Sequence, residues 1–433
     1  MFRRVLQWKL RMLARLMLKR FHPMVVGVTG SVGKTSTKEA IYTVLASKFR
    51  TGKNLKNYNN ELGVPLAILG EESGKSNPFS WLGIFLHGIG RLIFGDARYP
   101  HVLVLEMGAD KTGDIQYLTK LAPCTVGVVT AISGVHLEFF GTIERVISEK
   151  RKIVTHLKKD GFAILNADDD DVAAMREKTR AQVITYGFNE HADIRALEPS
   201  LSKGPHSAHD DHEKMEIRGI SYKMSYKGSI IPVFLPSVLG RHQVYAGLAA
   251  GAVGIALGLN LHEIADALQD FTSPPGRMNY LPGIKKIGII DDSYNSSPAA
   301  ALAALDALKQ FPAEGRKIAA LGDMAELGDA TVEGHTHVGR YAAEIGVDML
   351  VTVGEKAKII AQTAEEAGLP KDRISIFDHP ETAGKFIQRE AKENDVVLVK
   401  GSQVARMEKI VKELMAEPLL AEKLLVRQGR EWM

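Results

Sequence analysis

The sequence predicts an α/β protein built on two mostly parallel sheets. Short apolar runs at 24–28, 102–105 and 125–129 alternate with helical patterns. Such alternation is typical of a parallel sheet that is covered by helices on both faces. The length of 433 residues fits two or three domains. Pro274-Pro275-Gly276 interrupts the pattern, because these residues break both helices and strands. A second sheet is therefore expected after this linker.

Composition and charge exclude several classes of protein. Cys124 is the one cysteine, which excludes a disulfide framework and a multi-cysteine zinc site. Residues 1–22 hold seven basic residues and no acidic one, so the rest of the chain has 55 − 7 = 48 basic and 51 acidic side chains. Outside residues 1–22 the chain therefore has no excess of positive charge with which to bind nucleic acid. No apolar run approaches the roughly 18 residues of a spanning helix, and we expect a cytoplasmic protein.

Residues 1–22 form the first predicted unit, a basic amphipathic helix over 2–20. One predicted side is apolar and the opposite side is polar, with Phe2, Val5, Leu6, Leu13, Leu16 and Met17 facing away from Arg4, Gln7, Arg11 and Arg15. Such a helix can lie at the inner face of a membrane, where anionic lipid contributes about 1 kcal/mol per basic residue. It can equally pack on the domain that follows. Both interpretations are kept as expectations.

The strongest local signal follows the first predicted strand. The apolar run 24–28 leads into Thr29-Gly30-Ser31-Val32-Gly33-Lys34-Thr35-Ser36, and a helical pattern continues to about Lys48. In such a turn, backbone N–H groups surround phosphate oxygens, Lys34 reaches the terminal phosphates and the Thr35 hydroxyl binds Mg²⁺. The sequence therefore predicts a nucleotide-phosphate site in a P-loop NTPase-like domain.

Two polar residues follow neighbouring predicted strands. Glu106 comes directly after the run 102–105, and His136 follows the run 125–129 by one loop. Because parallel strands present ligands at their carboxyl edge, both side chains are expected near the nucleotide, where a carboxylate can hold Mg²⁺. Lys150 lies in the charged stretch 148–152, whose composition alone indicates a solvated helix face.

The rest of the chain divides at the linker. We expect a central domain over 23–274, with an insertion at 71–100 and an antiparallel hairpin in the region 200–235. The apolar stretch Trp81–Phe94 in the insertion is too short to span a bilayer, and it is either core-facing or a second membrane contact. Beyond the linker, strands are predicted at 287–290, 318–321, 349–353, 375–377 and 396–399. Their alternation with helices predicts a Rossmann-like domain over 275–433.

Several segments resemble the Mur ligases. Those of the central domain are Thr29–Thr35, Asn59–Pro65, Leu105–Ala109 and His136–Gly141. Those that resemble the branch adding D-alanyl-D-alanine to a UDP-N-acetylmuramoyl tripeptide are Asp291–Asn295, Leu321–Gly328 and Val399–Ser402. The resemblance covers about residues 24–415, and it implies an ATP-dependent amide ligase of peptidoglycan precursor synthesis. The implied reaction passes through an acyl phosphate.

The resemblance also implies roles for individual residues of the central domain. Thr35 and Glu106 would bind one Mg²⁺, and His136 would help to bind a second. Lys150 aligns with a family lysine that is carbamylated by CO₂, which turns the cation into a carboxylate-like metal ligand. Asn59 and Asn60 lie where the family contacts substrate or phosphate.

In the domain after the linker, the implied roles concern the nucleotide and the incoming amine. The nucleotide contacts would be Arg277, Asp292 and Asn295. The positions in the part that holds the amine would be Lys400, Ser402 and Arg406. Two departures from the family pattern fall here, Asn295-Ser296-Ser297-Pro298 and Gln403.

A further departure concerns the start of the sequence. About 23 residues precede the first predicted strand, where Mur ligases carry a domain that binds the UDP-sugar in this branch. The expected acceptor is thus a UDP-sugar peptide or a related carboxylate, including a lipid-linked one, with D-alanyl-D-alanine or a similar amine. The alternatives are a folate-type or other-polymer ligase, and a nucleotide-gated scaffold at the membrane.

Overall fold

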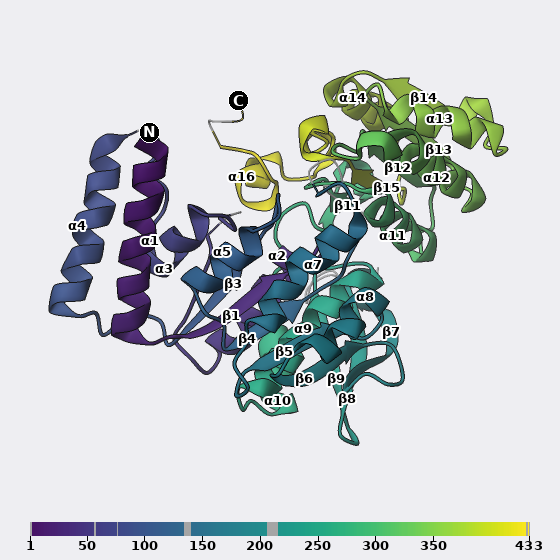
Figure 1. Ribbon diagram of the computed structural model, residues 1–433. Helices are drawn as coiled ribbons and strands as arrows, with labels where there is room; N and C mark the ends of the chain where they lie inside the picture. Colours follow the sequence, from purple (N-terminus) through teal and green to yellow (C-terminus); the bar gives the residue numbers. More distant parts are fainter. Residues whose placement is uncertain are drawn as a thin grey trace.

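The computed structural model describes residues 2–55, 58–75, 77–133, 140–205, 215–429 and 432. These residues form two sheets that are covered by helices, the first in the purple to teal part of the chain and the second in the green to yellow part (Figure 1). The predicted α/β class is confirmed.

The first sheet has nine strands among the described residues. Their bounds are β1 (Met24–Thr29), β2 (Thr51–Lys53), β3 (Val102–Glu106), β4 (Val126–Val129), β5 (Phe162–Asn166), β6 (Gln182–Gly187), β7 (Ile194–Pro205), β8 (Met215–Tyr226) and β9 (Ser229–Pro236). The strand order is β2-β3-β1-β4-β5-β6-β7-β8-β9. Neighbours from β2 to β7 are parallel, whereas β7, β8 and β9 pair antiparallel. The hairpin predicted in the region 200–235 corresponds to β8 and β9.

Alternate side chains of these strands enter two different cores. Val26 and Val28 of β1 join one cluster, whereas Val25 joins the other. Because successive strand residues point to opposite faces, both faces of the sheet are buried. The helices that cover them are α1 (Phe2–Phe21), α2 (Lys34–Ala46), α3 (Gly63–Leu69), α4 (Pro78–Phe94), α5 (Asp114–Leu121), α7 (Ile143–Thr155), α8 (Asp170–Ala173), α9 (Arg241–Ala256) and α10 (Leu261–Leu268).

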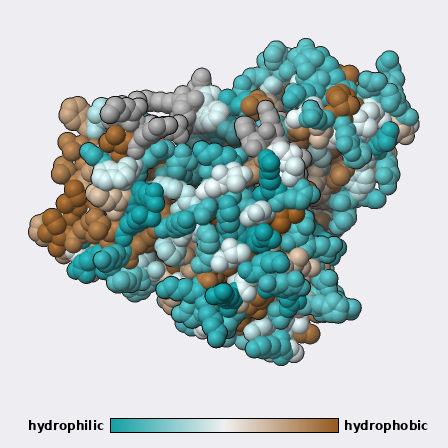
Figure 2. Space-filling view, in the orientation of Figure 1, coloured by the Kyte–Doolittle hydropathy of each residue, from teal (hydrophilic) through white to brown (hydrophobic). Residues whose placement is uncertain are grey.

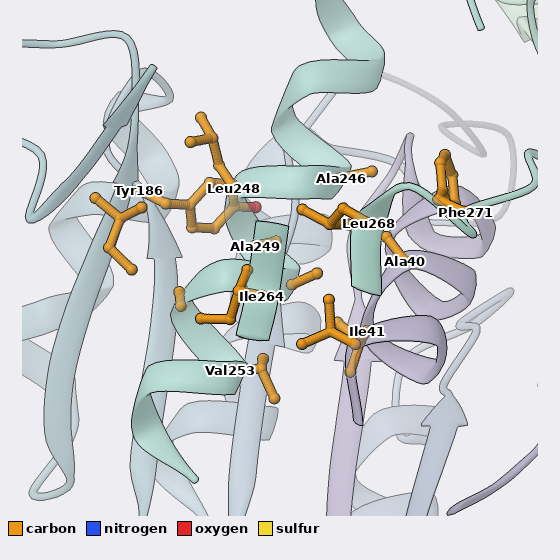
Figure 3. Packing of buried hydrophobic residues seen from close by; sticks show 14 of the residues in the cluster. Ala40, Ile41, Tyr186, Ala246, Leu248, Ala249, Val253, Ile264, Leu268 and Phe271 are labelled. Atoms are coloured by element: carbon orange, nitrogen blue, oxygen red, sulfur yellow. The ribbon is translucent and has the colours of Figure 1, made fainter. Parts of the chain in front are cut away.

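Helices α2, α9 and α10 cover one of these faces. Their packing is close because α9 is rich in alanine and glycine, and Figure 3 shows Ala249 and Val253 of α9 beside Ile41 of α2 and Ile264 of α10. This packing fixes the start of α2, which carries the phosphate loop.

Helix α1 packs on the opposite face, together with α3, α4 and α5. Its buried residues are Leu6, Leu10, Leu13, Ala14 and Met17. The interpretation of a helix packed on the following domain is thus confirmed, but the predicted apolar side was wrong at Val5 and Leu16, each 44% exposed. The physical reason is that α1 carries two apolar stripes and the core accepts only one. Across the described residues, the model contains no helix with the length and apolarity needed to cross a membrane.

The second sheet has the strand order β10-β11-β15-β12-β13-β14, in which β10 is antiparallel and the other neighbours are parallel. The strands are β10 (Asn279–Pro282), β11 (Gly288–Asp292), β12 (Lys317–Gly322), β13 (Met349–Val353), β14 (Ile374–Phe377) and β15 (Val396–Lys400). The helices are α11 (Pro298–Gln310), α12 (Thr331–Glu344), α13 (Ala357–Glu366), α14 (Pro380–Glu390), α15 (Glu408–Leu414) and α16 (Ala421–Leu424). All five strands predicted after the linker are present.

Short 3₁₀ helices complete the described elements. They are η1 (Ala174–Lys178), η2 (Ile284–Lys286), η3 (Gly328–Ala330), η4 (Lys371–Arg373), η5 (Gln403–Ala405) and η6 (Pro418–Leu420).

Candidate active site

The loop between β1 and α2 has a backbone that requires glycine at two positions. Gly33 precedes α2 with φ 80°, and Gly30 has φ 149°. A Cβ at Gly30 would lie 1.9 Å from Thr130 Oγ1, closer than any real contact. The loop can thus present its N–H groups at the start of α2, where the helix dipole favours an anion.

Polar side chains at the ends of neighbouring strands hold this loop in place. The Thr130 hydroxyl, just after β4, donates to the carbonyl of Val32 at 2.6 Å. The Ser31 hydroxyl donates to the carbonyl of Ser133 at 3.1 Å, and the Thr29 hydroxyl donates to that of Met107 at 2.8 Å. The sequence analysis missed Thr130, although its place at a strand end is the signal that identified Glu106.

Two lysine ammonium groups meet at one backbone carbonyl. Lys34 Nζ and Lys150 Nζ each donate to the Gly30 oxygen at 2.9 Å. Burial lowers the pKa of Lys34. Burial, and then the positive charge of Lys34, lower the pKa of Lys150 to about 7. The solvated face that composition indicated for Lys150 was wrong, because α7 packs this side chain against the phosphate loop and leaves it 2% exposed.

Glu106 ends β3 with one carboxylate oxygen unpartnered. Its Oε1 accepts a hydrogen bond from Asn59 Nδ2 at 3.0 Å, while its Oε2 is buried and has no hydrogen-bond partner among the described residues. The backbone N–H of Glu106 donates to Asn54 Oδ1 at 2.6 Å, so Asn54, which the sequence analysis also missed, positions this residue. A buried, unpaired carboxylate oxygen is costly unless a cation meets it. The geometry therefore fits a Mg²⁺ ligand.

Arg277 connects the linker to the phosphate loop. Its Nη2 donates to the Thr35 hydroxyl at 3.0 Å, and its guanidinium lies 4.0 Å from the centre of the Tyr294 ring. The backbone carbonyl of Arg277 accepts from Gln243 Nε2 at 2.9 Å. A cation from beyond the linker thus lies beside the residues expected to bind phosphate.

A second polar cluster lies at the carboxyl ends of β11 and β15. Lys400 Nζ pairs with Asp292 Oδ2 at 2.5 Å and donates to the carbonyl of Asn295 at 2.9 Å. Burial is the main cause that lowers the pKa of His242, while the nearby charge of Asp292 raises this pKa and that of Lys400 lowers it. The structure thus brings together Asp292, Asn295 and Lys400.

Other predicted site residues have local partners. The Ser402 hydroxyl is buried and unpartnered within the described part of the chain. Arg406 pairs with Glu408 at 2.6 Å and lies over the Trp432 ring. Asn60 Oδ1 accepts from the backbone N–H groups of Leu62 and Gly63, so it holds the turn that leads into α3. Ser36 is buried in α2, and His136 lies outside the described residues.

A cavity of about 500 Å³ is lined by Asn59, the residue that donates to Glu106. Its lining comes from α1, from residues 59–61, and from the segment 108–114 with α5, and the α1 residues are Gln7, Trp8 and Arg11. The Arg11 guanidinium lies 4.9 Å from the centre of the Tyr117 ring, and its buried Nε has no hydrogen-bond partner in the described ranges. Helix α1 therefore contributes one cation, Arg11, to a cavity whose lining also holds Lys111 and the acidic Glu61, Asp110 and Asp114. Among the residues described, no group of three or more His, Cys, Asp or Glu side chains could hold a metal ion.

Comparisons with known proteins assign these features to a family. Residues 28–77 and 90–254 match the Mur ligase middle domain, and residues 276–403 match the Mur ligase, glutamate ligase domain. A UDP-N-acetylmuramoyl-tripeptide--D-alanyl-D-alanine ligase of Mycobacterium tuberculosis (strain ATCC 25618 / H37Rv) is 30% identical over 417 residues, which cover 91% of this chain and 73% of the relative. The chain belongs to the Mur ligase family.

Solved structures of Mur ligases share this fold over most of its length. MurF from Acinetobacter baumannii aligns with a TM-score of 0.76 at 27% identity, over 94% of this chain and 79% of that one. MurF ligase from Thermotoga maritima, in complex with ADP, aligns with a TM-score of 0.74 at 29% identity, over 94% and 83%. The predicted resemblance is confirmed, and this Mur ligase is an ATP-dependent enzyme.

Proposed function

We propose that this Mur ligase joins D-alanyl-D-alanine to a UDP-N-acetylmuramoyl tripeptide in peptidoglycan precursor synthesis. The observation that carries the proposal is that Arg277 and Glu106 both meet the phosphate loop: Arg277 donates to the Thr35 hydroxyl, and Glu106 pairs with Val28 at the end of β1. The names of the relatives and of the solved neighbours support the two substrates. A carboxylate oxygen of the tripeptide attacks the γ-phosphorus of ATP and ADP leaves. The dipeptide amine then attacks the acyl phosphate carbon, and phosphate and a proton leave.

The phosphate loop is the proposed ATP site. N–H groups of the loop and of the first turn of α2 would surround the phosphates, apart from that of Ser31, which donates to the Ala131 carbonyl at 2.7 Å. Lys34 would turn from the Gly30 and Ser31 carbonyls, which it bonds at 2.9 and 3.0 Å, toward the transferring phosphoryl group. Its charge offsets the repulsion between two anions that must approach each other.

We propose that two Mg²⁺ ions bind at the edge of the sheet. Thr35 and the unpartnered Oε2 of Glu106 would hold the first, and His136 with a carbamylated Lys150 would hold the second. When bound, Mg²⁺ supplies positive charge to the phosphoryl oxygens. Support for the carbamate comes from the burial of Lys150 beside Lys34: two cations on one carbonyl repel each other, whereas a carbamate would attract both Lys34 and a metal ion.

The part of the chain after the linker would complete the nucleotide and amine sites. Arg277 would contact the nucleotide phosphates, and Asp292 and Asn295 would contact the nucleotide. The positions proposed for the incoming amine are Lys400, Ser402 and Arg406. Closure of this part on the phosphate loop would exclude water and protect the acyl phosphate from hydrolysis.

The acceptor would bind in the cavity between α1 and residues 59–61. Asn59 and Asn60 line it together with Trp8 and Arg11 of α1. The Arg11 side chain lines this cavity and its guanidinium is suited to an anionic group of the acceptor, and the aromatic side chain of Trp8 offers a stacking surface. Helix α1 would thus form part of the acceptor site.

We also propose a division of the chain into residues 1–22, 23–274 and 275–433, and a cytoplasmic location. Residues 28–77 and 90–254, and then 276–403, match the two family domains, which supports the division at the linker. The peripheral membrane contact predicted for residues 1–22 is a separate proposal, and it shares Trp8 of α1 with the cavity wall.

Product mass tests the proposed reaction directly. The full chain is incubated with ATP, Mg²⁺, bicarbonate, UDP-N-acetylmuramoyl tripeptide and D-alanyl-D-alanine. We expect a product heavier than the tripeptide by one D-alanyl-D-alanine unit, with one ADP released per bond formed. ADP release without that product would point to a different acceptor or amine. Absence of both in the presence of all substrates would contradict the ligase.

Carbamylation is tested without turnover. The full chain is equilibrated with ¹³C-bicarbonate, and a carbamate carbon signal is sought by NMR. We expect one signal in the wild type and its loss in Lys150→Gln, whereas Lys152→Gln, two residues along α7, keeps it. A wild-type protein without the signal would remove the carbamate and leave the phosphate site intact.

A further inference from the structure

Helices α1 and α4 leave a row of large apolar side chains in solvent. Figure 2 shows hydrophobic surface gathered over these two helices at one end of the molecule. Among the described residues, the exposed members are Val5, Trp8, Met12 and Leu16 of α1 and Phe79, Leu82, Leu86, Ile89, Ile93 and Phe94 of α4. We name this set the α1–α4 face. Phe79 and Phe94, at opposite ends of α4, are 82% and 87% exposed. An apolar patch of this extent marks an interaction surface.

The spacing of these residues makes the face continuous. Along both helices they recur mostly every three or four positions, so each set occupies one side of its helix. The helices pack closely, since a Cβ at Gly88 of α4 would lie 2.7 Å from Leu13 Cδ2 of α1. Figure 1 shows α1 and α4 side by side. The buried stripe of each helix thus packs in the core, and the second stripe of each helix is exposed to solvent.

Charge decides what can cover this face. Helix α1 contains no acidic residue, and its exposed Lys9, Arg15, Lys19 and Arg20 lie beside the apolar stripe. Helix α4 adds Arg91, which pairs with Asp96 at 3.1 Å and is thereby neutralised. The rim of the face is therefore positive, and the aliphatic stems of its lysines and arginines can extend along an apolar surface while the charges reach outward.

We propose that the α1–α4 face binds the surface of a membrane that contains anionic lipids. An apolar layer with a basic rim is complementary to the acyl boundary and to negatively charged headgroups. Helix α4 has 17 residues, about 25 Å of helix against a hydrocarbon core of about 30 Å. Helix α4 therefore lies in the plane of the interface, and the basic helix α1, which packs against it, lies in the same plane. This proposal is independent of the ligase reaction.

Docking in this way sets the orientation of the cavity. Trp8 belongs to the α1–α4 face and also lines the acceptor cavity. The membrane-bound enzyme thus holds that cavity beside the headgroups, and the sheet of β10–β15 stays on the side away from the lipid, as Figure 1 shows for its place relative to α4.

Vesicle co-sedimentation of the full chain tests the proposal. The vesicles contain phosphatidylglycerol and phosphatidylcholine in equal amounts, or phosphatidylcholine alone. We expect binding to the anionic vesicles and a partition coefficient at least about tenfold lower for Leu86→Glu/Ile93→Glu, since burial of two large apolar side chains is lost. The matched control is Leu419→Glu/Val332→Glu, two exposed apolar residues far from the face, which should bind as the wild type does. Thermal melting confirms that both variants fold.

The basic rim is tested separately. Lys9→Gln, Arg15→Gln and Lys19→Gln should each lower binding by about fivefold, and added salt should weaken it. Equal binding of the wild type to both kinds of vesicle would overturn the anionic-lipid assignment. Equal binding of the wild type and the Leu86→Glu/Ile93→Glu variant would overturn the α1–α4 face. A wild-type dimer that forms through this face and ignores vesicles would assign it to a second copy of the chain.

Discussion

The phosphate loop and the α1–α4 face both belong to the part of the chain that forms the first sheet. The loop region buries charged side chains, whereas the face exposes apolar ones. Around the loop, charged groups such as Lys150 and Glu106 are 2% and 3% exposed. On the face, Trp8 and Phe94 are 60% and 87% exposed. Folding stability alone disfavours both arrangements. The difference indicates what completes each region: small charged ligands for the loop and an extended apolar surface for the face.

Loss of the loop lysine should have the largest effect. In Lys34→Ala, kcat/KM falls at least about 10³-fold, because the charge that stabilises the transferring phosphoryl group is removed. The melting temperature should not fall, since one of two adjacent buried cations is lost. ADP release and thermal melting measure the two effects. Leu86→Glu on the α1–α4 face should keep its solution activity. A Lys34→Ala enzyme within tenfold of wild type would contradict the role of the loop.

Glu106→Gln should have the second-largest effect on activity. The amide keeps the shape and can still accept from Asn59, but it lacks the negative charge that the metal needs. We expect kcat/KM to fall about 10²-fold, with a higher Mg²⁺ requirement. Without Mg²⁺ the variant should melt at a higher temperature than wild type, because a buried unpaired carboxylate oxygen is gone. Glu355→Gln, at an exposed position, serves as the control. A lower melting temperature in Glu106→Gln would show that the carboxylate has a stabilising partner.

The loop was predictable because its chemistry is carried by consecutive residues. Thr29–Ser36 between a strand and a helix predicts the same structure in many contexts, and Glu106 followed from its place after a strand. Lys150 did not follow from composition, because its burial depends on packing against Gly30, 120 positions earlier in the chain. Only the resemblance to Mur ligases indicated its place.

Helix α1 shows that the burial of apolar side chains also depends on packing that the local sequence does not reveal. Its sequence contains two stripes, and periodicity alone cannot tell which one meets the core. The choice is made by α3, α4 and the cluster around Leu10 and Met17. Asn54 and Thr130 could have been found, since each follows a strand at the edge that holds Glu106. Both carry side chains that do not ionise, unlike Glu106 and His136.

Two glycines allow the rigidity of the regions to be compared. In Gly30→Ala, the new Cβ meets Thr130, whose hydroxyl is tied to the Val32 carbonyl, and the backbone is in the region that favours glycine. We expect a loss of about 2–4 kcal/mol in the free energy of unfolding. In Gly88→Ala, the Cβ meets the end of the Leu13 side chain, which can move, and alanine favours the helix. The expected loss is about 1 kcal/mol or less.

Urea unfolding measures both variants under the same conditions. The order of the two losses is the decisive result, because it compares a backbone that is held from several strands with a helix crossing that can adjust. If Gly88→Ala were the more destabilised variant, the α1–α4 layer would be the more rigid of the two regions. The exposed face would then be a fixed platform.

The smallest expected effect comes from Arg11. It tests whether α1 contributes to the acceptor cavity as well as to the α1–α4 face. Arg11 lies on the side of α1 that lines the cavity, and its Nε is buried without a hydrogen-bond partner among the residues described. Arg11→Gln should raise the KM for the acceptor about tenfold and leave the KM for ATP unchanged, because one charge-assisted contact is lost. Arg15→Gln, exposed on the same helix, should leave both constants unchanged while weakening vesicle binding. If the two variants behaved alike, α1 would have a single function, and the cavity wall would be only a consequence of how the helix is packed.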